Sequence, residues 1–325
     1  MTEMTMIEAV NHALDEALAR DPDVVVLGQD VGVDGGIFRA TLGLIEKYGA
    51  NRVIDTPLAE SGILGMALGM SFNGMKPVAE IQFSGFSYQA FHQLENHAAR
   101  FRWRTRGRFP VPMVARMPYG AGVRALEHHS ESREAYWAHT PGLKIVIPSG
   151  PRTARALLLA AIDDPDPVVF YEPKALYRGF REEVPDEPET MEIGRARIAR
   201  EGRDITMIAY GAMLPRTLEA AERLSAEGVL AEVIDLQTLS PLDEATLLAS
   251  AQKTGRVLVV HEAARSFGPG AEICARLNDK VFFSLEAPVK RVTGYDIHPP
   301  FFAREHYYLP SVARILDEAR DTLSL

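Results

Sequence analysis

Apolar positions near the start of the chain recur with a helical period. Residues 4–20 place apolar side chains three or four positions apart, at Ile7, Val10, Ala13, Leu14 and Leu18. Thr5 and Glu8 have the spacing of a capping box, in which each side chain accepts from a backbone N–H of the other residue's turn. The pattern therefore predicts an amphipathic helix that begins after Thr5.

Short apolar runs without alternation follow this helix at regular intervals. They predict buried strands at residues 24–27, 77–81, 113–116, 144–147 and 168–171. The segments between them include predicted helices at residues 58–69, 88–102 and 152–162. Strands that alternate with helices of about 10–15 residues indicate a parallel sheet, and uninterrupted apolar strands indicate that both of its faces are covered.

An acidic stretch that contains prolines interrupts the alternation of predicted strands and helices, which then continues. Residues 182–189 read Glu-Glu-Val-Pro-Asp-Glu-Pro-Glu, which is typical of a surface linker. A second series of strands and helices begins with a strand at 205–210 and ends with a helix at 311–323. We therefore predict an α/β protein with two parallel-sheet domains, at residues 1–180 and 201–325, joined by a linker at 181–200.

Composition narrows the function classes. The 325 residues carry a formal net charge of −9, which disfavours nucleic-acid binding because phosphate neutralisation needs clustered cations. The basic run from Arg100 to Arg108 is a local exception, interpreted as a solvated or interface segment rather than a polyanion site. The single cysteine, Cys274, rules out an intrachain disulfide. The N-terminus lacks a signal-peptide pattern and no apolar run is long enough to span a membrane, so we expect a cytoplasmic protein.

Glu60 is the first candidate for chemistry. It opens the glycine-rich apolar segment 60–69, where a charged carboxylate is costly, and sharing a proton with a ring nitrogen would relieve that cost. The alternative is ordinary placement of an acidic residue at a helix N-terminus.

A histidine pair and an aromatic segment give further candidates. His128 and His129 follow the glycine-bearing loop 119–123, and a loop histidine suits acid–base chemistry or substrate binding. Zinc binding is disfavoured because no HExxH or Cys/His spacing accompanies the pair. Residues 81–88 place aromatic side chains directly after a strand, where they would stack on a flat ring or simply fill the core. The acids at 163–166 suit either a cation site or a solvated turn.

Several motifs in order resemble the beta subunits of heterotetrameric 2-oxo acid dehydrogenases, over essentially the whole chain. The segment Asp-Thr-Pro-Leu-Ala-Glu-Ser-Gly at 55–62 carries the resemblance most clearly. Further matching segments lie at residues 27–32, 35–38, 52–55, 77–83, 141–144, 166–170 and 253–256.

The resemblance implies an enzyme that decarboxylates pyruvate or branched-chain 2-oxo acids oxidatively and transfers the acyl group to lipoyl groups of an acyltransferase core. It implies an α₂β₂ assembly, active only with its alpha subunit, with thiamine diphosphate between subunits. The family's alpha chain holds the diphosphate and Mg²⁺ through a Gly-Asp-Gly motif, and this chain contains no such triplet. The fold implied is a pyrimidine-binding domain followed by a transketolase-C-terminal-like domain.

Site residues follow by position from the same resemblance. Glu60 corresponds to the acid that hydrogen-bonds the cofactor's pyrimidine, and His129, rather than His128, to the active-site histidine. Phe86 corresponds to the aromatic residue against the pyrimidine, and Gln82 to a neighbouring pocket residue. A structural monovalent-cation loop, for an ion such as K⁺, corresponds to Ala161, Asp164 and Asp166.

Two departures and three alternatives remain. Gln29 and Gln89 stand where family members carry acids of a proposed proton channel between active sites, and glutamine cannot titrate.

The substrate is open between pyruvate, branched-chain 2-oxo acids and acetoin. A non-catalytic scaffold, or a hydrolase built on His128 and His129, are the other function classes. The C-terminal helix and Leu325 are candidates for docking the acyltransferase.

Overall fold

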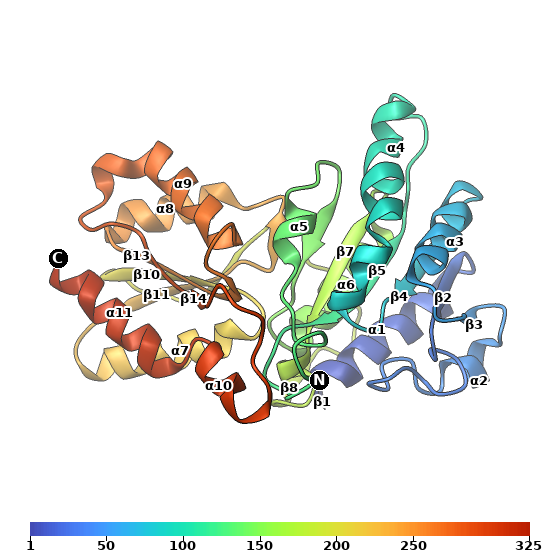
Figure 1. Cartoon of the computed structure of the whole chain (residues 1–325), viewed down its shortest axis with the longest axis horizontal. Helices are drawn as coiled ribbons and strands as arrows, with labels where there is room; N and C mark the ends of the chain where they lie inside the picture. The colour runs from blue at the N-terminus through green and yellow to red at the C-terminus, as the bar shows by residue number, and fades with distance from the viewer.

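In the computed structural model, which describes residues 1–325, a seven-stranded sheet forms the centre of the first domain (Figure 1). Its strands are β2 (Val24–Gly28), β3 (Val53–Asp55), β4 (Lys76–Glu80), β5 (Val114–Tyr119), β6 (Lys144–Val146), β7 (Val168–Pro173) and β12 (Thr238–Ser240). Their order is β12-β6-β7-β5-β4-β2-β3, and only the pair β12–β6 is antiparallel. The mainly parallel sheet predicted from the sequence is confirmed.

Alternate residues of each strand pack on opposite faces of this sheet. Val168 and Phe170 of β7 belong to one apolar cluster, whereas Val169 and Tyr171 belong to the other. The first cluster includes buried residues of α1 (Met6–Arg20) and α6 (Pro151–Asp163). The second includes those of α3 (Glu60–Phe72) and a π-helix (Gln93–Ala98). Coverage on both faces explains why the strand sequences are apolar throughout.

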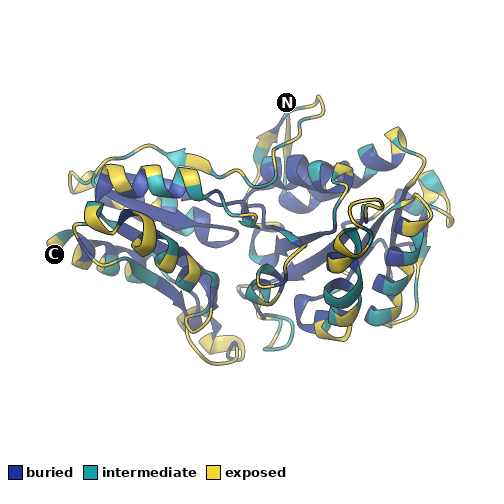
Figure 2. Cartoon of the chain, turned by 90° about the horizontal axis from the view of Figure 1, so that it is seen from above, coloured by how far each residue is buried: buried dark blue, intermediate teal, exposed yellow.

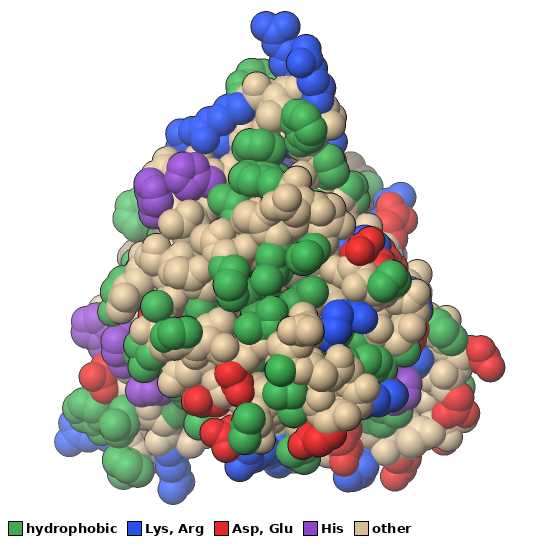
Figure 3. Space-filling view, turned by 90° about the vertical axis from the view of Figure 1, so that its right-hand side faces the viewer, with side chains coloured by type: hydrophobic (Ala, Val, Ile, Leu, Met, Phe, Trp, Pro, Cys, Tyr) green, Lys and Arg blue, Asp and Glu red, His purple; other side chains and the backbone are tan.

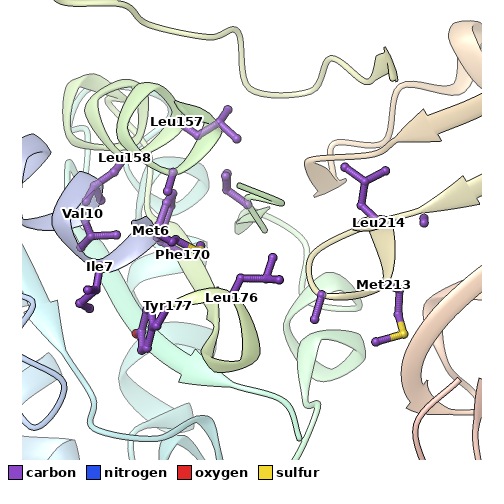
Figure 4. Packing of buried hydrophobic residues seen from close by; sticks show 14 of the residues in the cluster. Met6, Ile7, Val10, Leu157, Leu158, Phe170, Leu176, Tyr177, Met213 and Leu214 are labelled. Carbon is purple, nitrogen blue, oxygen red and sulfur yellow. The ribbon is translucent and has the colours of Figure 1, made fainter. Parts of the chain in front are cut away.

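Helix α1 shows how local sequence and packing agree. The capping box of Thr5 and Glu8 is present, and Asp21 ends the helix in an extended conformation. Val10 of α1 lies next to Leu158 of α6 in Figure 4, and Met6, Ile7 and Val10 belong to the same apolar cluster as Leu157 and Leu158. The predicted helix is therefore confirmed, together with the mechanism that starts it.

A five-stranded sheet forms the centre of the second domain. Its strands are β9 (Arg197–Arg200), β10 (Ile205–Ala209), β11 (Ala231–Asp235), β13 (Val257–Ala264) and β14 (Lys290–Gly294). In the order β14-β13-β10-β11-β9, only β9 is antiparallel to its neighbour. Figure 2 shows both sheets buried beneath helices whose outer faces are exposed. The main helices here are α7 (Met213–Ala226), α8 (Glu244–Thr254), α9 (Pro269–Val281) and α11 (Val312–Ser324).

Short elements complete the chain. Strands β1 (Thr2–Met4) and β8 (Glu182–Val184) form a separate antiparallel pair. The short α-helices are α2 (Leu44–Tyr48), α4 (Ala99–Arg104), α5 (Glu134–Ala138) and α10 (Glu305–Tyr308). Single 3-10 turns lie at Ser84–Gln89, Lys174–Leu176, Phe282–Ser284 and Phe302–Arg304. No helix has the length and apolarity that crossing a lipid bilayer requires.

Two sequence-based expectations need correction. The helix expected at residues 88–102 is present over residues 91–104, where it follows a 3-10 helix and includes the π-helix before α4. The stretch expected as a linker, 181–200, contains β8 and β9, and β9 pairs with β11 of the second sheet. Strand β12, from the second half of the sequence, extends the first sheet beside β6.

The basic run from Arg100 to Arg108 lies at the tip of α4 and the turn after it, where Figure 3 shows cationic side chains at the apex of the molecule. Arg100 pairs with Glu95, and Arg102 pairs with Asp166. Trp103, which follows Arg102, is 88% exposed. Both interpretations offered from sequence, a solvated segment or an interface segment, fit an apex of this kind.

A buried charge cluster links the three central strands of the first sheet. Arg116 of β5 donates from Nε and Nη2 to both carboxylate oxygens of Glu172 on β7, at 2.6 and 2.9 Å. Its Nη1 donates to Glu80 of β4 at 2.9 Å, and Tyr177 donates to Glu172 at 2.5 Å. These three charged side chains are at most 2% exposed. Burial raises the pKa of Glu80, and the Arg116 charge opposes that rise.

Replacing Arg116 by methionine should destabilise the protein by about 3–5 kcal/mol, because two buried carboxylates would lose their shared cation. Urea-induced unfolding followed by circular dichroism measures the change. Arg223→Met is the matched control, since its i,i+4 pair with Glu219 is more than half exposed and contributes about 0.5 kcal/mol or less. Equal losses in the two variants would contradict a structural role for the buried cluster.

Candidate active site

Four candidate residues follow three parallel strands of the first sheet at their carboxyl ends. Glu60 comes after β3, Gln82 and Phe86 after β4, and His129 after β5. Parallel strands end at the same edge of a sheet, so these segments gather there. We call this region the carboxyl edge of the first sheet.

Glu60 is the first residue of α3 and is 6% exposed. Its Oε2 atom is buried and has no hydrogen-bond partner within the chain. Both sequence interpretations therefore describe its position, since it lies at a helix N-terminus and in apolar surroundings. Placement at the helix end leaves the orphaned oxygen unexplained, because a buried acceptor without a donor is costly. A ring N–H donor brought from outside the chain would satisfy it.

The loop after β2 is fixed next to this helix start. The Asp55 carboxylate, at the end of β3, accepts from the backbone N–H groups of Gly32 at 2.6 Å and Val33 at 3.0 Å. Gln82 donates from Nε2 to Asp30 Oδ2 at 2.9 Å, which ties the loop after β4 to the loop after β2. Asp30, which the sequence did not single out, has a positive φ of 59°.

Aromatic rings form one wall at the carboxyl edge. The His129 ring lies edge-to-face with Phe83, at a centroid distance of 4.2 Å, and with Phe86, at 5.3 Å. Burial, followed by the charges of His128 and Lys174, lowers the pKa of His129. Its imidazole is consequently neutral at physiological pH and able to accept a proton.

The two adjacent histidines differ in their contacts. The His128 Nε2 atom lies 3.2 Å from the Gly85 carbonyl oxygen and 3.3 Å from the Tyr88 hydroxyl. These contacts attach the histidine loop, residues 120–131, to the 3-10 helix Ser84–Gln89. His129 makes no such hydrogen bond, which leaves both of its ring nitrogens available. No group of three or more His, Cys, Asp or Glu side chains gathers to hold a metal ion.

The acidic segment at residues 163–166 is held by cations of the chain itself. Lys144 donates to both Asp164 carboxylate oxygens at 2.7 Å and lies 3.7 Å from Asp166, which also pairs with Arg102. Ala161 is buried in the last turn of α6. Because the Asp164 and Asp166 carboxylates are engaged, backbone carbonyls are the ligands left for a monovalent cation at this loop.

Sequence reasoning missed the buried amine of Lys174. This side chain is 3% exposed, and its Nζ lies 5.9 Å from the centroid of the Phe83 ring without any hydrogen-bond partner. Burial lowers the pKa of Lys174 to about 7, while Glu262 and Glu305 of the second domain oppose that shift. The only sequence signal was a lysine placed directly after an apolar strand run.

Comparison with known proteins gives matches along nearly the whole chain. The family described as "Transketolase, pyrimidine binding domain" matches residues 2–179, and "Transketolase, C-terminal domain" matches residues 194–315. The chain is 51% identical to the "Pyruvate dehydrogenase E1 component subunit beta" of Acholeplasma laidlawii, with 97% of this chain and 96% of that protein covered. It is 50% identical to the protein of the same name from Bacillus subtilis, with 99% of each covered.

Solved structures agree on the fold. A "Split gene transketolase, inactive beta4 tetramer" superposes with a TM-score of 0.81 at 25% identity, covering 99% of both chains. A transketolase from Campylobacter jejuni gives a TM-score of 0.73 at 12% identity, covering 98% of this chain and 47% of the other. The second likeness concerns the fold alone.

Gly85→Ala tests how the histidine loop is seated. A Cβ at Gly85 would stand 2.1 Å from the His128 carbonyl oxygen, so the loop must move away. We expect a loss of about 1–3 kcal/mol in stability. We also expect a rise in the pKa of His129 as its ring leaves the aromatic wall, measured by NMR titration of the histidine rings. Gly69→Ala, where nothing lies within 4 Å, is the control, and identical titrations in both variants would refute this seating.

Proposed function

Because this chain belongs to the family of E1 beta subunits of 2-oxo acid dehydrogenases, with transketolase pyrimidine-binding and C-terminal domains, we propose that it is the beta subunit of a pyruvate dehydrogenase E1 component. It acts with an alpha subunit, in an α₂β₂ assembly, to decarboxylate pyruvate oxidatively. The acyl group then passes to lipoyl groups of an acyltransferase core. The observation that carries the proposal is the buried, unpartnered Oε2 of Glu60 at the same carboxyl edge of the sheet that carries the aromatic wall.

The residues at the carboxyl edge fit the pyrimidine half of thiamine diphosphate. Bound at this edge, the cofactor supplies a nucleophilic thiazolium carbon for attack on the 2-oxo group. Glu60 hydrogen-bonds a pyrimidine ring nitrogen and holds a proton there, Phe86 packs on the ring, and Gln82 borders it. The chain has no Gly-Asp-Gly triplet, which supports assigning the diphosphate and Mg²⁺ to the alpha subunit.

His129 is the second catalytic residue in this proposal. Its neutral imidazole exchanges protons with the bound 2-oxo acid or with the lipoyl group during acyl transfer. Phe83 and Phe86 restrict the ring to one orientation through their edge-to-face contacts. The loop at Ala161, Asp164 and Asp166 has a structural role in this proposal, with carbonyl oxygens binding K⁺.

Glu60→Gln, co-expressed with the matching alpha subunit, should lower kcat/KM for pyruvate by about 10²–10⁴-fold, because an amide cannot share a proton with the ring. Decarboxylation is measured with an artificial electron acceptor, thiamine diphosphate and Mg²⁺, and 3-methyl-2-oxobutanoate and acetoin are compared as substrates. Stability should not fall, because the substitution removes a buried unpartnered carboxylate.

Glu244→Gln is the matched control, because Glu244 is likewise the first residue of a helix. It should keep full turnover and lose at most about 1 kcal/mol of stability. If the Glu60→Gln variant retains turnover, Glu60 has no catalytic role and is an ordinary acidic residue at a helix N-terminus. A well-assembled wild type that turns over none of the three substrates would favour a non-catalytic scaffold.

A further inference from the structure

The histidine loop is closed at its base by the first domain. The Gly120 backbone N–H donates to the Glu131 carbonyl oxygen at 3.1 Å, and the Ser84 hydroxyl donates to the same oxygen at 2.9 Å. Residues 120–131 therefore form a closed segment that carries His129 against the aromatic wall. We call this segment the histidine loop.

Its next two backbone donors are taken by carboxylates of the second domain. Ala121 N–H donates to Glu262 Oε2 on β13 at 2.9 Å, and Gly122 N–H donates to Glu305 Oε1 at the start of α10. The Glu262 and Glu305 side chains come from sequence positions about 140 and 180 residues away, yet they are only 2% and 4% exposed. Three consecutive N–H groups, those of residues 120–122, thus have defined acceptors.

The local sequence is adapted to this approach. Gly120 has φ +83° and Gly122 has φ +104°, conformations that side-chain-bearing residues rarely adopt. A Cβ at Gly120 would stand 2.6 Å from Glu262 Oε1, so a larger residue would displace the carboxylate. The glycine-bearing loop at residues 119–123 therefore forms a contact between the domains that depends on its glycines.

Lys174 connects the same carboxylates to the aromatic wall. Its ammonium group is attracted to both Glu262 and Glu305, and it lies over the Phe83 ring that His129 contacts. Glu262 Oε1 and Lys174 Nζ have no partners within the chain, so neither is committed elsewhere. Burial raises the pKa of Glu262 and lowers the pKa of Lys174, each to about 7, so the junction behind the histidine loop holds titratable groups of opposite type.

We propose that Glu262 and Glu305 are positioning residues for catalysis, which hold residues 121 and 122 so that His129 stays against Phe83 and Phe86. The second domain thereby completes the active site in addition to any part it has in assembly. This inference rests on the proposed function of His129. It assigns a defined task to two buried acids of the second domain.

Glu262→Ala and Glu262→Gln in the assembled enzyme test the proposal. In hydrogen–deuterium exchange without substrate, the alanine variant should exchange the amides of residues 120–129 at least about tenfold faster, because Ala121 N–H loses its acceptor. The kcat/KM for pyruvate should fall by about tenfold or more, as expected for a displaced catalytic group. Glutamine retains an acceptor oxygen and should restore both measurements to within about threefold of the wild type.

Asp204→Ala is the control, because Asp204 also accepts a backbone N–H, from Leu230 at 2.6 Å, but within the second domain. It should leave exchange in the histidine loop and turnover unchanged. Wild-type exchange in Glu262→Ala, or an equal effect of Asp204→Ala, would overturn the proposal. If Glu262→Ala does not assemble, Glu305→Ala and Glu305→Gln make the same comparison at Gly122. A wild type without turnover would refute the proposed function, whereas the exchange comparison would still decide the positioning role.

Discussion

One buried guanidinium group sets the geometry of the first domain. Arg116 joins β4, β5 and β7 through Glu80 and Glu172, on the sheet face that is otherwise apolar. A one-residue slip of β5 would turn Arg116 to the opposite face and leave two carboxylates buried without a cation. The cluster therefore opposes alternative registers of three central strands. Glu80 and Glu172 lie at the carboxyl ends of β4 and β7, where these strands pass into site segments.

The positions of the site residues follow from that register. Gln82 is two residues beyond Glu80, the histidine loop begins four residues beyond Arg116, and Lys174 is two residues beyond Glu172. Over such short separations a side chain has little freedom to move independently of its strand. The aromatic wall is thus held by the same interaction that aligns the sheet. Catalytic groups on loops gain their precision from rigid elements in this way.

Features of the fold and the site could be predicted from the sequence when the contacts that produce them join residues close together in the chain. The capping box of α1 and the apolar strands were readable because their signals span only a few residues. The π-helix inside the predicted 88–102 helix was not readable; next to it, Phe91 packs against Trp137, which is distant in the sequence. Glu60, His129, Phe86 and Gln82 came from the family resemblance, whereas local patterns left each with an ordinary structural alternative. Glu262 and Glu305 gave no signal, and Lys174 only a weak one, since these side chains meet only after two domains fold together.

The chain's polar groups also show where its own structure is incomplete. Arg116 satisfies the buried carboxylates of Glu80 and Glu172, whereas Glu60 Oε2, like Glu134 Oε2 and Glu262 Oε1, is buried without a partner in the chain. On the same, mostly apolar helix, Met66 and Phe72 are 39% and 45% exposed. An unsatisfied acceptor and uncovered apolar side chains on one helix are two deficits of different kinds. In the proposed function, a ring N–H satisfies the acceptor, and the surface of a partner subunit covers the apolar side chains.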